Sequence, residues 1–274
     1  MSDLNLRAEI AGQSYTVDLR PLDISILLEF DGPQPNTYGV PKASAVAFEG
    51  GGFVGDTRRG GGCNFETYTL TPHCNGTHTE CVGHITDERI PVAEVLRPGL
   101  VPATVISVAP IAAAATTETY DPPLVAEDWV IDAGTLHTAL ESTDPDFHGA
   151  IVIRTLPNSE EKLSRDYLQK PPAFFTNAAV QYLVELGLKH LLVDLPSVDR
   201  MFDEGKLSNH HYFWEVAQGS HAVDPQPALW RTITEMVFVP DFVPDGRYLL
   251  DLQIAPFLAD ATPSRPTLYA LQSR

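Results

Sequence analysis

The hydrophobic positions of this chain fall into short runs, a pattern that predicts many strands and few helices. Residues 4–19 alternate loosely between apolar and polar side chains and predict strands. The runs at 101–108, 150–155 and 190–195 are rich in aliphatic and β-branched residues, which predicts buried strands. Residues 64–70 alternate again and predict a strand that leads into a histidine-rich segment. The pattern therefore indicates a protein with a substantial β core.

Two segments have the period of a helix. In residues 178–188 apolar side chains return every three or four positions, and Gly187 supplies a stop signal. Because a buried run follows at once, this helix-to-strand unit is the clearest local prediction. Residues 131–140 predict a shorter helix, with Asp128 or Asp132 available as its cap.

Glycine and proline interrupt the pattern between residues 30 and 62. Glycine triplets at 50–52 and 60–62 mark loops or bulges, so we expect a long irregular region near the surface. The alanine run at 112–115 fits a helix or a loop equally well.

Composition narrows the class of protein. The chain has 274 residues, of which 43% are hydrophobic, so it can bury a large core, and we favour one domain over two. Its formal charge of -18 argues against nucleic acid or an anionic membrane as the main partner, because the field would repel phosphate. Residues 1–18 lack the features of a signal peptide, and no apolar run reaches membrane length. With only three cysteines, which fit reduced thiols, we expect a cytoplasmic protein.

Candidate chemistry is concentrated in residues 71–84, which hold three of the nine histidines and two of the three cysteines. His78 and Glu80 are two residues apart, so in an extended segment both side chains leave the same face and can converge on one cation. A turn at 75–77 could fold Cys74 or His73 back towards them. The alternative is a polar loop with hydrogen-bonded histidines and buried cysteines, and spacing alone does not separate the two.

The run from Asn75 to Glu80, closing at His84, resembles the HxGTHxDxPxH signature of the metal-dependent cyclase family, which includes bacterial kynurenine formamidases and isatin hydrolases. Two positions depart from that signature. Cys74, with His73 beside it, stands where the family has its first ligand histidine, and Glu80 stands where it has aspartate. Since cysteine and glutamate are both zinc ligands, the resemblance implies a metal bound by Cys74, His78 and Glu80.

Further blocks resemble the same family in the same order, at residues 149–155, 179–199 and 248–266. The family completes its metal site with a later histidine and a glutamate, and His210 and Glu235 match that pair. His211 is the neighbouring alternative to His210, and an aromatic packing corner is the alternative to a metal site. The gap between His210 and Glu235 is longer than usual in the family, which predicts an inserted loop around residues 212–230 over the pocket.

The resemblance implies an α/β fold over residues 1–274, a single domain with a mixed, largely antiparallel β core of the swivelling β/β/α, cyclase-like type, flanked by helices. It also implies a homo-oligomer that acts on a small molecule. The expected activity is metal-dependent hydrolysis of an amide or cyclic amide, arylformamidase-like, at C–N bonds other than peptide bonds. Zinc is the expected metal and manganese the alternative, with metal-activated water as the nucleophile and His84 as the general acid or base.

Two other classes of function fit the same residues. The altered ligands could leave a metal-free protein that binds a small molecule without turnover. A lyase or dehydratase could use the same metal to stabilise an enolate. Asp194, Ser197 and Asp199 follow a buried run, so they could either orient metal ligands or cap a turn.

Overall fold

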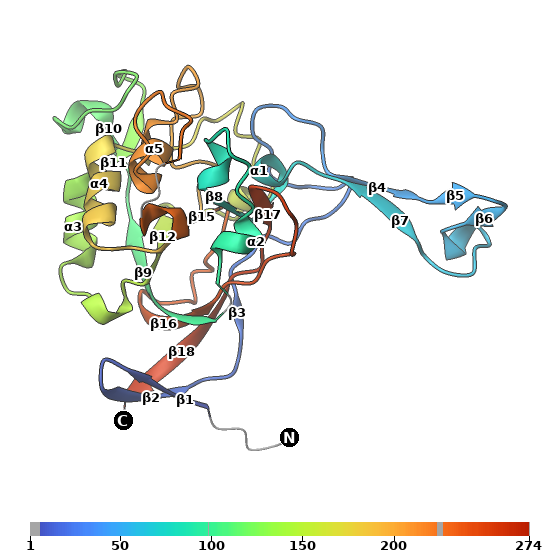
Figure 1. Ribbon diagram of the computed structural model, residues 1–274, viewed down its shortest axis with the longest axis horizontal. Coiled ribbons are helices and arrows are strands. Elements are labelled where there is room, and N and C mark those ends of the chain that lie inside the picture. Colours follow the sequence, from blue (N-terminus) through green and yellow to red (C-terminus); the bar gives the residue numbers. More distant parts are fainter. Residues whose placement is uncertain (1–5, 98, 224–226, 274) are drawn as a thin grey trace.

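The computed structural model describes residues 6–97, 99–223 and 227–273. Its centre is a sheet of 11 strands (Figure 1). In spatial order the strands are β1 (Leu6–Ile10), β2 (Gln13–Val17), β18 (Thr267–Ser273), β16 (Gly246–Asp251), β9 (Leu100–Val108), β12 (Ala150–Thr155), β14 (His190–Val193), β15 (Thr232–Glu235), β8 (His78–Cys81) and β17 (Ala261–Pro263), with β3 (Leu22–Asp23) paired to β18.

The sheet is mixed, with a parallel centre and antiparallel flanks. Strands β9, β12, β14 and β15 run parallel. Strands β8 and β17 on one side, and β16, β18, β2 and β1 on the other, pair in antiparallel fashion. The predicted fold class, a mixed and largely antiparallel core, is therefore confirmed. Since β8 runs against β15, it begins at the edge where β15 ends.

Helices α3 (Ala133–Leu140), α4 (Asn177–Glu185) and α5 (Ser208–Trp214) cover one face of the sheet (Figure 1). Their apolar side chains share a buried core with β12, β14 and β15. The helix predicted at 178–188 is confirmed, and it begins after a Thr176 cap. The helix predicted at 131–140 starts later than expected, because Ile131 pairs with Phe175 in a small sheet and Asp132 then caps the helix.

The opposite face of the sheet carries a second core, to which β9, β12, β16 and β18 all contribute side chains. Strands at 101–108, 150–155 and 190–195 are confirmed within a residue or two, and the amino-terminal prediction corresponds to β1 and β2, with residues 4 and 5 outside the described part. Residues 112–115, left open by the pattern, divide between the end of a strand and a 3-10 turn.

The remaining elements are short. The small sheet consists of β10 (Ile111–Ala112), β11 (Trp129–Ile131) and β13 (Phe174–Phe175). The single-turn helices are α1 (Pro72–Asn75), α2 (Val92–Val95), η1 (Thr57–Arg59), η2 (Val82–His84), η3 (Ala113–Ala115), η4 (Pro145–Phe147), η5 (Glu160–Leu163) and η6 (Pro227–Trp230). Within the described residues, no helix is both long and apolar enough to cross a membrane.

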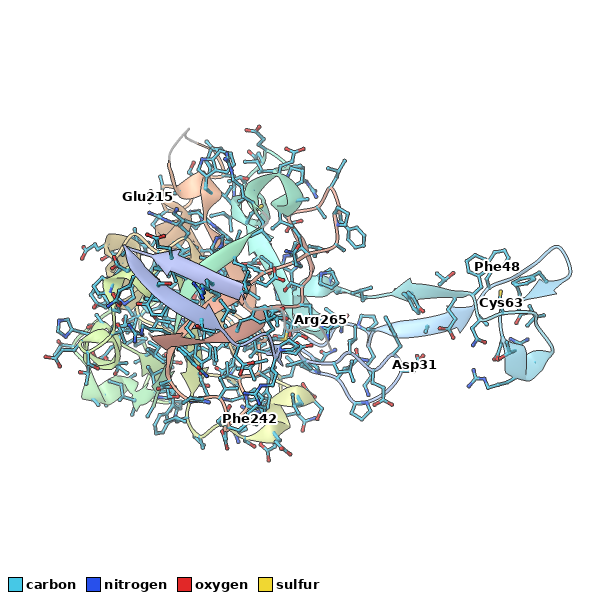
Figure 2. The ribbon with its side chains drawn as sticks, turned by 90° about the horizontal axis from the view of Figure 1, so that it is seen from below. Asp31, Phe48, Cys63, Glu215, Phe242 and Arg265 are labelled. Atoms are coloured by element: carbon cyan, nitrogen blue, oxygen red, sulfur yellow. The ribbon has the colours of Figure 1, made fainter. Side chains whose placement is uncertain are left out.

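A ribbon of strands projects from the body as an arm (Figures 1 and 2). It pairs β4 (Ser44–Ala47) with β7 (Glu66–Thr69), and β5 (Glu49–Gly50) with β6 (Phe53–Val54) towards the tip. The expectation of an irregular region at 30–62 is therefore wrong for its second half. The reason is aromatic packing, because Phe48, Phe53 and Phe65 contact one another with ring centroids 5.1 to 6.4 Å apart. The strand predicted at 64–70 is confirmed as β7 and leads into the histidine-rich segment.

Candidate metal centre

Strands β8 and β15 bring the two predicted halves of the site together. Glu235, the last residue of β15, lies opposite His78, the first of β8. The Nε2 atom of His78 is 3.4 Å from Glu235 Oε2 and 4.0 Å from Glu80 Oε2. All three side chains are buried, and His78 and Glu80 leave the same face of the strand, as their spacing predicts.

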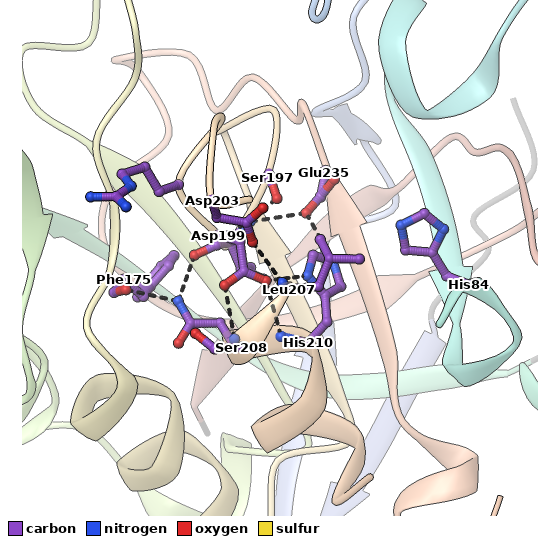
Figure 3. Close-up of polar contacts among 12 residues, drawn as sticks. His84, Phe175, Ser197, Asp199, Asp203, Leu207, Ser208, His210 and Glu235 are labelled. Atoms are coloured by element: carbon purple, nitrogen blue, oxygen red, sulfur yellow. Dashed lines mark hydrogen bonds and ion pairs between the residues drawn. The ribbon is translucent and has the colours of Figure 1, made fainter. Parts of the chain in front are cut away.

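His210 reaches the same point from α5. The start of this helix is held by two carboxylates: Asp203 accepts a hydrogen bond from the Leu207 amide at 2.6 Å, and Asp199 accepts from the amides of Asn209 and His210. Figure 3 shows these carboxylates at the start of α5, with Glu235 beside His210 and with His84 on the side of His210 away from Asp199. His210 Nε2 lies 2.9 Å from Glu80 Oε1 and 3.8 Å from Glu235 Oε1.

A more exposed pair of histidines closes the cluster on the solvent side. The rings of His73 and His84 stack with centroids 4.4 Å apart. Asp260 lies between their nitrogens, with its Oδ2 atom 3.2 Å from His73 Nε2 and 3.3 Å from His84 Nδ1. The other nitrogen of His84, Nε2, is 3.9 Å from Glu80 Oε2. Both rings are 27% exposed, so the cluster is reached from this side.

Three sets of donor atoms within the described residues are close enough to hold a cation. In each set the donor atoms all lie within 4.8 Å of one another: His78 with Glu80 and Glu235, Glu80 with His84 and His210, and His73 with His84 and Asp260. Because Glu80 and His84 each belong to two sets, the sets are adjacent and form one cluster, which we call the metal cluster.

Hydrogen bonds to Nδ1 of His78 and of His210 orient these rings so that Nε2 faces the cluster. His78 Nδ1 lies 3.0 Å from the carbonyl oxygen of Gly76, which can only accept, so Nδ1 carries the proton and Nε2 presents a lone pair. Asp199 Oδ2 lies 2.5 Å from His210 Nδ1 and orients that ring in the same way. His78 Nε2 and Glu80 Oε2 are buried and have no hydrogen-bond partner among the described residues. Both belong to the set completed by Glu235, and a divalent cation held by that set would satisfy both atoms, so the residues fit a metal.

Burial and mutual charge separate the protonation states of the cluster. Burial, with His73 nearby, lowers the pKa of His78 to about 4, which keeps this ring neutral. Burial opposes the charge of His210, but Glu80 and Asp199 raise its pKa well above the ordinary value. Burial and the charge of Glu80 raise the pKa of Glu235 to about 8. Burial also disfavours a charged Glu80, yet His84 and His210 bring its pKa well below the usual range.

Cys74 is outside the cluster. Of the described residues, the three sets include His73 and omit Cys74, so the placement favours His73 where the resemblance had implied Cys74. Both residues lie on the single turn of α1, where adjacent side chains point in different directions, and the ring of His73 is the one that turns towards Glu80. Burial and the charge of Glu235 raise the pKa of Cys74 to about 11, which disfavours a thiolate.

His211 is also outside the three sets. Its Nδ1 atom lies 3.3 Å from the Val216 carbonyl oxygen, and burial lowers its pKa. His210 is therefore the member of the pair that faces the cluster. Part of the expected insertion at 212–230 packs beside the segment that follows His84, where the Asp87 amide donates a hydrogen bond to the His221 carbonyl oxygen at 2.9 Å. Residues 224–226 lie outside the described part, and the insertion itself stays a prediction.

Asp260 was missed by the sequence reading. It lies inside the block at 248–266 that resembles the family's closing segment, so its position there was the available signal. Of the three residues read as orienting groups or turn caps, Asp199 orients His210, Ser197 accepts from the Asp199 amide at 3.1 Å, and Asp194 is paired elsewhere, with Lys162 at 2.7 Å.

Comparisons with known proteins agree with the fold. The chain resembles isatin hydrolase A from Labrenzia aggregata, with a TM-score of 0.60, 14% identity, and coverage of 92% of this chain and 94% of that one. It also resembles a "potential metal-dependent hydrolase with cyclase activity" (TM-score 0.58, 15% identity, 92% and 98% covered) and a "predicted metal-dependent hydrolase" from Bacillus stearothermophilus (0.56, 15%, 91% and 98%).

A comparison with curated proteins gave no match. The family model described as "Putative cyclase" matches residues 18–200, which is more than half of the chain and includes His73, His78, Glu80 and His84. The protein therefore belongs to the cyclase family.

Proposed function

We propose that this protein is a metal-dependent hydrolase that cleaves the C–N bond of an amide or cyclic amide in a small aromatic molecule. The observation that carries the proposal is the pair of buried ligand atoms without hydrogen-bond partners in the described structure, His78 Nε2 and Glu80 Oε2. Leaving such atoms unsatisfied is costly unless a ligand completes them. Several structural neighbours are described as hydrolases, which agrees with the proposal.

The proposed ligands are His78, Glu80, His210 and Glu235, with His73 replacing Cys74. Without the thiolate the donors are imidazole and carboxylate, a set that suits zinc or manganese. A divalent ion bound there supplies Lewis-acid activation of water and of a carbonyl group. Asp199 holds His210 in position and the Gly76 carbonyl holds His78, so the donor geometry is set before binding.

His84 is the proposed general acid or base. Asp260 fixes its ring through Nδ1 at 3.3 Å, which leaves Nε2 directed at the cluster, 3.9 Å from Glu80. The ring is partly exposed, so it can contact both substrate and solvent. In hydrolysis His84 would take a proton from the attacking water and return it to the departing nitrogen.

Two aromatic residues near the cluster support an aromatic substrate. Tyr38 and Phe202 meet edge to face with ring centroids 6.2 Å apart, and both are well exposed. Burial and the charge of Glu235 raise the pKa of Tyr38, so its phenol lies within electrostatic reach of the metal ligands. We propose that this pair contacts the ring of the substrate.

The test combines metal analysis with an activity panel. Purified protein loaded with zinc or with manganese would be assayed against an N-formylanilide, isatin and a simple aliphatic lactam. We expect tightly bound metal, hydrolysis of an aromatic member, and loss of both in Glu80→Gln. Metal-loaded protein that leaves every member intact would contradict hydrolysis and favour a lyase. Protein that binds no metal would favour the metal-free binding reading.

We also propose that the protein is cytoplasmic and forms a homo-oligomer. The oligomer is supported by the arm, whose side chains Val46, Phe65 and Tyr68 are more than half exposed, because an isolated two-stranded ribbon is marginally stable in water. Sedimentation of the wild type against a Phe65→Ser, Tyr68→Ser double variant tests it. A monomeric wild type would contradict the proposal.

A further inference from the structure

A cavity lies at the carboxyl ends of β12 and β14, and none of the residues that line it belongs to the metal cluster. Its volume is about 310 Å³, at the lower end of the range for small-molecule sites, which suits a ligand with one ring. Four prolines and Trp129 supply much of its wall, and Lys162, Arg165 and Lys170 supply three positive charges. This concentration of cations is unusual in a chain with a formal charge of -18.

Lys162 is already neutralised inside the protein. Its ammonium group donates to Asp194 at 2.7 Å and to the Thr155 carbonyl at 2.6 Å, and both Lys162 and Asp194 are buried. Its role is structural, and it has little capacity left for a ligand.

Arg165 and Lys170 are only weakly compensated. Both rely on Glu161, whose carboxylate is 69% exposed and lies 3.4 Å from Arg165 and 3.8 Å from Lys170. The Nε atom of Arg165 is buried and has no hydrogen-bond partner in the part of the chain that the structure describes. One exposed carboxylate therefore serves two cations, which leaves part of their positive charge for an incoming anion.

The walls of the cavity favour a flat ring. Trp129 is 57% exposed and Leu156 is 42% exposed, which is unusual for side chains of this size. Proline offers no backbone donor, so the proline walls are apolar and rigid. The ring of Tyr167 lies 5.7 Å from the Arg165 guanidinium carbon and holds that group at the cavity wall.

We propose that this cavity binds a small aromatic carboxylate. The carboxylate accepts from the guanidinium of Arg165 and is attracted by Lys170, while the ring lies against Trp129 and the prolines. The site is separate from the metal cluster, so the inference does not depend on the proposed hydrolysis.

The experiment titrates benzoate into the metal-loaded full-length protein by calorimetry, with benzamide as the neutral ligand of the same shape. We expect benzoate to bind, and benzamide to bind at least about tenfold more weakly, as the loss of a charge-assisted hydrogen bond predicts. Arg165→Gln should weaken benzoate binding about tenfold and Lys170→Gln by less, because Lys170 is exposed and screened. Arg58→Gln, on the arm, is the matched control and should bind as the wild type does.

One further variant, His84→Gln, separates this site from the metal cluster. Benzoate binding that is unchanged in His84→Gln and weakened about tenfold in Arg165→Gln supports the proposal. The reverse pattern, or equal binding of benzamide, overturns it, and so does an absence of benzoate binding. If Arg165→Gln does not fold, Arg165→Lys keeps the charge and loses the paired donors, and an affinity unchanged from the wild type would then count against the proposal.

Discussion

Two buried groups of charged residues in this protein differ in how completely they are satisfied. Asp194 accepts hydrogen bonds from the Thr155 amide and hydroxyl at 2.8 Å each and from Lys162 at 2.7 Å. Glu80 is equally buried, yet its Oε2 atom has no hydrogen-bond partner among the described residues, and neither has the nearby Nε2 atom of His78. Lys162 balances the charge of Asp194 within the protein, whereas we propose that a bound cation satisfies Glu80 and His78.

The largest expected effect follows from removing a ligand of the metal cluster. His78→Ala and Glu235→Ala should each lose nearly all bound metal, because each deletes a buried donor that nothing nearby replaces. Elemental analysis of the purified variants measures this. His211→Ala is the matched control, since that ring lies outside the cluster, and it should keep its metal. Wild-type metal content in both ligand variants would make the site assignment wrong.

The next effect concerns the proton-transfer group. His84→Gln should lower turnover by about 10²–10⁴, or roughly 3 to 5 kcal/mol of barrier, while metal stays bound. Turnover and metal content must be measured together. If metal and activity disappear together, His84 is a ligand, and near-normal turnover in a metal-loaded variant would remove the acid or base role.

Disrupting the pair formed by Asp194 and Lys162 should lower the stability of the protein without affecting metal binding. Asp194→Leu should lower the free energy of unfolding by about 3–5 kcal/mol, because Lys162 is left buried without a counter-charge. Metal content should not change. The double variant Asp194→Leu, Lys162→Met removes both charges and should recover most of the loss in a denaturant titration. A double variant as unstable as the single one would argue against pairing as the cause.

A smaller effect on metal binding is expected from a residue that orients a ligand without binding the metal itself. Asp199→Asn should weaken metal binding about 10- to 100-fold, since the carboxylate that orients His210 is lost while every donor to the cation remains. Competition with a chelator measures the affinity. Ser197→Ala, two residues away on the same turn, provides the comparison and should bind metal nearly as tightly as the wild type.

The smallest effect should come from Cys74. Its thiol is buried with a raised pKa, so Cys74→Ser should leave metal content unchanged, and alkylation of Cys74 should be slow with or without metal. His73→Ala is the informative partner and should lose metal. If bound zinc instead protects Cys74 strongly from alkylation, Cys74 is a metal ligand.

Part of the candidate site could be predicted from sequence because its chemistry is local. His78 and Glu80 share a face through the period of a strand, and the resemblance to the cyclase family located His210 and Glu235 far along the chain. The buried strands β9, β12 and β14 could be predicted equally well, since a strand covered on both faces needs apolar residues throughout.

Tertiary structure decided the rest. No local pattern distinguishes His73 from Cys74, because the choice depends on which side chain of a single helical turn points towards Glu80. Asp260 joins the cluster only because β17 pairs beside β8. The separate fates of Asp194 and Asp199 depend on Lys162 and His210, which approach them from other elements. Sequence by itself determined the donor types and the strand pattern, while packing determined which donors are left without a partner.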